Sequence, residues 1–277
     1  MPNLELPFSI SEYATRLDLV RKSMDDNNIE VLFTCDPSNM AWLSGYDGWS
    51  FYVHQGVLIG PVGDPIFWGR KMDAVGATLT CYMNNDRIHG YSDDFVMSDK
   101  HAMLDLSNVI SDYGWSNLRL GVELDNYYYS AKAHQTLSLN HNGNILDITG
   151  LINWCRAIKT DQELKYMRRA GQIVERMHAK IFDIFEPGRR KNEVAAEIYH
   201  TGIWGGEDED GLLLKSHLVA YVQATFEEIE DSLFNFIDEI QLLPLDIETL
   251  LSVDVGDKGI VIDSLKELAD IAEDLDL

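Results

Sequence analysis

The sequence predicts an α/β protein with a mixed sheet and flanking helices, followed by further helices and an acidic helical segment. Short apolar runs alternate with segments of helical periodicity over residues 1–155, as is typical of a layered α/β fold. Two amphipathic segments then follow without a strand pattern between them. Beyond the acidic, glycine-rich stretch 205–211 the composition changes abruptly.

The first element is an amphipathic helix expected over residues 9–27. Its N-terminus combines Ser9 with Glu12, the pattern of a capping box, and Phe8 stands where it can pack onto Tyr13 as a hydrophobic staple. Apolar residues recur along it at helical spacing: Tyr13, Leu17, Val20 and Met24.

The elements that follow are short and bounded by turn-forming residues. Asp36 to Asn39 is predicted to be a turn. Residues 51–60 and 64–69 are predicted to be two strands joined as a hairpin through residues 60–63. The remaining expected helices are 72–80, 100–113 and 130–138, and the remaining expected strands are 29–34, 118–123 and 144–147.

A long amphipathic helix is expected to open at residues 158–164, where Thr160 and Glu163 form a second capping-box pattern. The helix is expected to end at the Glu186-Pro187-Gly188 sequence, and a shorter helix follows over 192–199. Positions of one face recur at steps of three and four residues: Leu164, Met167, Gly171, Val174, Met177, Ile181 and Phe185.

Composition limits the class of protein. The 277 residues contain no apolar run of membrane-spanning length and no signal-peptide pattern at the start, so a cytoplasmic location is expected. Cys35, Cys81 and Cys155 are odd in number and widely spaced, which argues against a disulfide framework and a zinc site. The net charge is −24, and residues 206–277 alone contain 20 acidic and 3 basic groups, so nucleic acid is not an expected partner.

Two stretches resemble the creatinase/prolidase superfamily. Residues 35–55, and within them the Gly-Tyr-Asp-Gly-Trp-Ser-Phe-Tyr sequence at 45–52, resemble the N-terminal domain of that superfamily and ectoine hydrolases in particular. The Lys-Thr-x-x-Glu-Leu sequence at 159–164 and the Pro-Gly stop at 187–188 resemble the opening helices of its catalytic "pita-bread" domain. The resemblance implies a homodimeric hydrolase that cleaves a C–N bond in a small cyclic amidine such as ectoine, without a required metal or other cofactor.

The resemblance also assigns candidate site residues. In these families the N-terminal domain leans over the active site of the neighbouring subunit, so Trp49, Tyr52 and His54 are candidates for lining a partner's substrate pocket. The residues by themselves leave a second interpretation open. Aromatic residues are ordinary constituents of strands, and a single histidine is often a structural hydrogen-bonding group.

The catalytic residues are not identified by the sequence. In the superfamily they lie in the second half of the pita-bread domain, and residues 206–277 do not resemble that half. Two pairs of acids, Asp246 with Asp257 and Asp263 with Asp274, have the spacing of metal ligands in the metallopeptidase members, but such pairs are expected by chance in so acidic a segment. His217 is the only histidine of this segment. A truncated and inactive hydrolase is therefore expected, with domains at 1–155, 156–205 and 206–277.

The acidic segment itself is predicted to contain two amphipathic helices, over 225–243 and 264–275. The Asp-Ser-Leu sequence at Ser264 resembles the phosphopantetheine attachment site of acyl carrier proteins. Ser264 is also an ordinary N-cap candidate paired with Glu267. The alternative function is thus a non-catalytic dimerisation or binding module fused to a carrier-like tail that binds basic partners.

Overall fold

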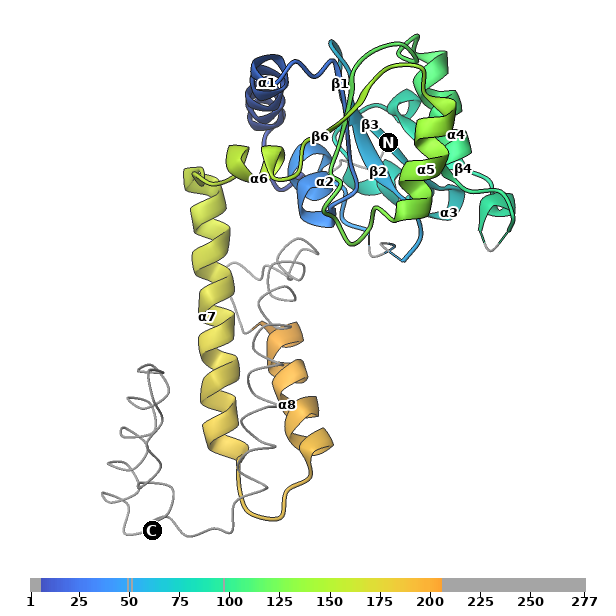
Figure 1. Cartoon of the computed structure of the whole chain (residues 1–277). Helices are drawn as coiled ribbons and strands as arrows, with labels where there is room; N and C mark the ends of the chain where they lie inside the picture. The colour runs from blue at the N-terminus through green and yellow to red at the C-terminus, as the bar shows by residue number, and fades with distance from the viewer. Residues whose placement is uncertain (1–5, 49, 51, 97, 206–277) are drawn as a thin grey trace, which may run out of the picture. The chain divides into compact units, whose positions relative to one another are not determined.

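The structure is a computed structural model that describes residues 6–48, 50, 52–96 and 98–205 (Figure 1). All of these belong to one structural unit of the chain. The α-helices are α1 (Ile10–Asp26), α2 (Pro37–Ser44), α3 (Lys71–Thr80), α4 (Met103–Asp112), α5 (Ala131–Asn140), α6 (Leu151–Cys155), α7 (Asp161–Ile184) and α8 (Lys191–Trp204). The strands are β1 (Val31–Thr34), β2 (Gly56–Ile59), β3 (Ile66–Arg70), β4 (Ile88–Tyr91), β5 (Leu120–Val122) and β6 (Ile145–Asp147), and short 3-10 turns cover Asn85–Arg87 and Asp93–Phe95.

The strands form one mixed sheet in the order β4-β3-β2-β1-β5-β6. β2 is antiparallel to both of its neighbours, and the other three pairings are parallel. The β2–β3 hairpin predicted from the sequence is confirmed, with Val57 opposite Phe67. The predicted α/β class with a mixed sheet is therefore confirmed.

Helices cover both faces of the sheet (Figure 1). α1, α2, α3 and α6 pack on one face through apolar residues that include Leu17, Val20, Met24, Met40, Leu43, Ala74, Ala77 and Ile152. α4 and α5 pack on the other face through residues that include Met103, Leu106, Val109, Ile110, Ala133 and Leu137. Short central strands are thus buried on both sides, which explains their continuous apolar runs.

Some sequence-based expectations were wrong in detail. Asp36 to Asn39 is not a free turn, because Asp36 is the N-cap of α2 and Pro37 occupies its first turn, a combination that starts a helix. The strand expected over 51–60 begins only at Gly56. β4 and α6 were not predicted, since β4 contains His89 and Gly90 and α6 has only five residues.

The start of α1 confirms the staple but only half of the capping box. The rings of Phe8 and Tyr13 meet edge to face with centroids 6.1 Å apart, and the Glu12 backbone N–H donates to Ser9 Oγ. The Glu12 carboxylate turns away from the cap. It accepts from Arg16 Nη2 at 2.6 Å and from Thr160 Oγ1 at 3.0 Å.

α7 and α8 form a helix pair (Figure 1). A Cβ added to Gly202 of α8 would lie 3.1 Å from Met177 Sδ of α7, so the two helices approach closely at this glycine. Ile173 and Ile184 of α7 and Val194 and Ile198 of α8 are also buried. No helix of the described ranges is both long and apolar enough to cross a membrane. The helices predicted over 225–243 and 264–275 lie outside the described residues.

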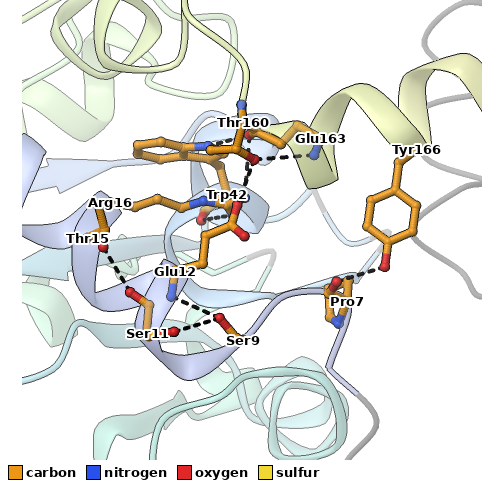
Figure 2. Close-up of polar contacts among 10 residues, drawn as sticks. All are labelled: Pro7, Ser9, Ser11, Glu12, Thr15, Arg16, Trp42, Thr160, Glu163 and Tyr166. Atoms are coloured by element: carbon orange, nitrogen blue, oxygen red, sulfur yellow. Dashed lines mark hydrogen bonds and ion pairs between the residues drawn. The ribbon is translucent and has the colours of Figure 1, made fainter.

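A buried polar junction holds the first turn of α7 against α1 and α2 (Figure 2). The second capping box is confirmed, with Glu163 Oε2 accepting from the Thr160 backbone N–H at 2.8 Å. The other oxygen, Oε1, accepts from Trp42 Nε1 at 2.8 Å and lies 3.4 Å from Arg16 Nη2. One carboxylate therefore caps a helix, binds an indole and neutralises a guanidinium.

The guanidinium of Arg16 is enclosed by aromatic rings as well as by acids. Its central carbon lies 3.9 Å from the ring centroid of Phe8 and 5.1 Å from that of Trp42, within the range of cation–π attraction. Arg16 Nη1 also donates to the Trp42 carbonyl at 3.0 Å. The side chains of Arg16 and Glu163 are only 3% and 4% exposed, so this pair is a buried ion pair.

Candidate functional site

The carboxyl ends of five strands meet at one edge of the sheet. β1, β3, β4, β5 and β6 point the same way, and β2 starts where they end. In α/β proteins ligands bind preferentially outside this edge, because the loops that carry functional groups gather there. Tyr52 and His54, two of the residues singled out from the sequence, immediately precede β2 and therefore belong to this edge.

Two hydrogen bonds hold the segment 50–54 at this edge. The Ser50 hydroxyl donates to Asp73 Oδ1 in the first turn of α3. The Tyr91 hydroxyl at the end of β4 donates to the His54 carbonyl at 2.7 Å. Tyr52 lies between these two points and is 67% exposed. Trp49, the third predicted member, lies outside the described residues.

His54 faces a second histidine, His101, which no local sequence pattern singles out. The imidazole centroids of His54 and His101 are 4.6 Å apart. Burial lowers the pKa of His54, and it lowers the pKa of His101 to about 4 with further contributions from His54 and Lys132. His101 Nδ1 accepts from the Met103 backbone N–H at 3.2 Å, so the ring proton belongs on Nε2. Two neutral imidazoles therefore lie in contact at neutral pH.

This pair predicts a pH dependence of stability. The pKa of folded His101, about 4, lies below its ordinary value of 6.5, so the stability that its neutral form provides is present above pH 6.5. It is lost as pH falls from 6.5 towards 4. In His101→Gln, which keeps a neutral acceptor for Met103, we expect the free energy of unfolding to fall less steeply over that interval than in the wild type. Urea unfolding at several pH values measures it, with His200→Gln on α8 as the control. Parallel pH profiles for His101→Gln and the wild type would contradict the prediction.

A second polar cluster lies between the ends of β1 and β5. Glu123 follows β5 and accepts from Thr34 Oγ1 and from Asn39 Nδ2, each at 2.7 Å. Burial raises the pKa of Glu123. Asn39 also accepts from Arg156 Nη1 at 2.7 Å and donates to Asn153 Oδ1 at 2.9 Å. The cluster is internally satisfied and joins the sheet edge to α6. A polar residue directly after a buried strand was the signal that could have identified Glu123.

Neither a metal-ligand cluster nor an activated thiol is found among the described residues of this edge. Within residues 6–205 and their stated gaps, no group of three or more His, Cys, Asp or Glu side chains could hold a metal ion. The three cysteines are free thiols, and burial raises the pKa of each, to about 12 for Cys81. They are therefore poor nucleophiles. The tail candidates Asp246, Asp257, Asp263, Asp274, His217 and Ser264 lie outside the described residues.

Comparisons with known proteins identify the fold. A family model described as the creatinase/prolidase N-terminal domain matches residues 16–158. Among solved structures, an Xaa-Pro dipeptidase from Bacillus anthracis matches with a TM-score of 0.54 at 17% identity, over 69% of this chain and 48% of that chain. The prolidase from Pyrococcus horikoshii gives a TM-score of 0.54 at 16% identity, over 70% of this chain and 50% of that chain. At these identities the likeness concerns the fold alone.

Some curated proteins have a higher sequence identity to this chain than these solved structures. An ectoine hydrolase of Halomonas elongata is 50% identical over 215 residues, which make up 76% of this chain and 54% of that protein. An uncharacterized hydrolase/peptidase of Sinorhizobium fredii is 38% identical over 210 residues, 75% of this chain and 54% of that protein. The chain spans about half the length of the curated relatives it matches. Because the family model covers more than half of the residues, the chain belongs to the creatinase/prolidase N-terminal domain family.

Proposed function

We propose that this chain is part of a hydrolase of the creatinase superfamily. That enzyme would cleave a C–N bond in ectoine or a similar small cyclic amidine. The observation that carries the proposal is the 50% identity to the Halomonas elongata ectoine hydrolase over 76% of the chain. The three free thiols are compatible with a reducing, cytoplasmic location.

Within such an enzyme we propose that the domain 1–155 forms a homodimer contact and lines the substrate pocket of a second copy with Trp49, Tyr52 and His54. Tyr52 supports this role, because it is exposed while the Ser50 hydroxyl before it is bonded to Asp73 and the His54 carbonyl after it is bonded to Tyr91. An exposed aromatic ring on an anchored segment can contact another molecule at a low cost in conformational entropy.

We propose further that the chain by itself does not turn over substrate. Hydrolysis needs an activated nucleophile and a proton donor within reach of the same bond. His54 and His101 are neutral neighbours, and Glu123 is fully engaged by its hydrogen-bond donors. The same observations favour the second candidate function, a non-catalytic dimerisation or binding module. Its carrier-like character at Ser264 is proposed from the Asp-Ser-Leu sequence alone.

A hybrid enzyme tests the first candidate. Residues 1–205 of this chain would replace the matching part of the Halomonas elongata ectoine hydrolase, whose remaining half is kept. We expect the hybrid to open the ectoine ring, followed by proton NMR, and the chain alone to be inactive at the same concentration. Tyr52→Ala in the hybrid is expected to raise KM, with Tyr127→Ala, an exposed tyrosine in the loop after β5, as the matched control.

A folded, dimeric hybrid without turnover would reject the ectoine hydrolase proposal and favour the binding module. Turnover by the chain alone would reject the proposal that its catalytic groups are incomplete. Light scattering separates these outcomes from a failure to assemble.

A further inference from the structure

An apolar stripe on α3 faces solvent. Met72, Val75 and Leu79 are 58%, 63% and 61% exposed, and Gly76 is exposed on the same face of the helix. The opposite face of α3 is already buried against the sheet. Apolar side chains that recur at helical spacing on the solvent side of a helix are typical of an interaction surface.

The exposed side of α3 carries no acid, although the protein is strongly acidic. Its exposed residues are Lys71 and the four residues of the stripe, whereas the chain as a whole has a net charge of −24. Two copies of so acidic a chain repel each other, and this repulsion is weakest where the meeting surfaces carry no acid. A basic partner would instead be attracted to the acidic surfaces. The composition of the stripe therefore favours a second copy of this chain as its occupant.

The stripe is complementary to itself when two α3 helices pack antiparallel across a two-fold axis. An axis at the peptide between Val75 and Gly76 places each Val75 against the partner's Gly76 and each Met72 against the partner's Leu79. A Cβ added to Gly76 would have no atom within 4 Å, so the space above this glycine is open to the valine of a second copy. Each helix thus offers both the projecting side chain and the space that receives it.

The same arrangement brings opposite charges together at the ends of the helices. Lys71, at the N-terminal end of α3, would lie beside the partner's Thr80 at the C-terminal end of the other helix. The last turn of α3 has no basic residue of its own to interact with the carbonyl groups that end the helix. Each lysine would therefore complement the dipole of the opposite helix.

α3 also supports the segment that the proposed function assigns to a neighbouring subunit. Ser50 donates to Asp73 in the first turn of α3, and Tyr52 follows two residues later with its side chain exposed. We propose that the α3 stripe, consisting of Met72, Val75, Gly76 and Leu79, is the surface through which two copies of this chain associate. The proposal rests on the homodimer proposed above and identifies where the copies meet. Four residues are fewer than the roughly 20–30 residues a side of a standard interface, so the stripe is its centre and not its whole area.

Sedimentation velocity of the full chain over a range of concentrations tests the surface. We expect a reversible monomer–dimer equilibrium for the wild type. Val75→Glu would bury a carboxylate of each copy against the other helix, so we expect it to raise the Kd of the dimer at least about tenfold. Leu139→Glu, at a 79% exposed leucine of α5, is the matched control and is expected to keep the wild-type Kd.

Cysteine pairs test the antiparallel register. A mixture of Met72→Cys and Leu79→Cys proteins is expected to form a disulfide-linked dimer when oxidised glutathione is added. Neither variant alone is expected to do so, because like positions lie at opposite ends of the contact. The wild type, which keeps the partly exposed Cys155, measures any background reaction.

The outcomes separate this surface from the homodimer itself. A wild type that stays monomeric at every concentration would overturn both. A Val75→Glu variant that dimerises as the wild type does would overturn the α3 surface alone, and the homodimer would then use another face. Far-UV circular dichroism checks that Val75→Glu is folded, and the cysteine mixture decides the question if it is not. Equal cross-linking in the mixture and in the single variants would overturn the antiparallel arrangement.

Discussion

Glu163→Ala is expected to lower the free energy of unfolding by about 3–5 kcal/mol, the range measured when one partner of a buried ion pair is removed. The change removes the ion-pair partner of Arg16 on α7, where the Arg16 side chain is 3% exposed, and leaves Glu12 as its paired acid. It also deprives Trp42 Nε1 of its acceptor and removes the reciprocal half of the α7 capping box. Urea unfolding, monitored by far-UV circular dichroism, measures the change.

Two further variants isolate the cause. Glu163→Gln keeps a capping side chain and an acceptor for the indole but loses the charge, so we expect a smaller loss than for alanine. The double variant Arg16→Met/Glu163→Leu removes both charges and is expected to be more stable than Glu163→Ala. A loss below about 1 kcal/mol in Glu163→Ala would show that the junction contributes little to folding.

This junction shows what the sequence could and could not predict. Thr160 and Glu163 are three residues apart, so their capping box follows from a local pattern and was predicted correctly. Trp42 is 121 residues from Glu163, and no local pattern pairs them. The start of α1 shows the same limit. The staple of Phe8 on Tyr13 is a local contact and was predicted, whereas the hydrogen bond from Thr160 to the Glu12 carboxylate joins residues far apart in sequence and was not.

The candidate site also contains residues that the sequence could predict and residues that it could not. Tyr52 and His54 were singled out by resemblance, and the structure places both at the carboxyl edge of the sheet. Asp73 of α3, Tyr91 of β4 and His101 in the loop before α4 support them, and these three residues are distant in sequence from the 50–54 segment. β4 was missed because its sequence, Ile-His-Gly-Tyr, lacks an apolar alternation, yet it supplies the Tyr91 hydroxyl.

Trp68→Ala is the second change with a large expected effect, a loss of about 3–5 kcal/mol in the free energy of unfolding. Among the described residues Trp68 is the largest fully buried side chain, and it belongs to the core beneath α4 and α5. Its ring centroid lies 6.0 Å from that of Phe33 and 4.9 Å from that of Tyr91. Its Nε1 donates to Asp105 Oδ1 of α4 at 2.7 Å.

Truncation at Trp68 would therefore open a cavity beneath α4 and leave a partly buried carboxylate without its donor. Trp68→Phe keeps most of the ring volume but loses the N–H, so we expect it to cost about 1–2 kcal/mol, and its difference from the alanine variant measures the filled space. Because Tyr91 packs on Trp68 and holds the His54 carbonyl, the alanine variant should also increase hydrogen exchange in peptides covering residues 52–56. Equal losses for the alanine and phenylalanine variants would mean that the bond to Asp105, rather than the filled space, anchors α4 to the sheet.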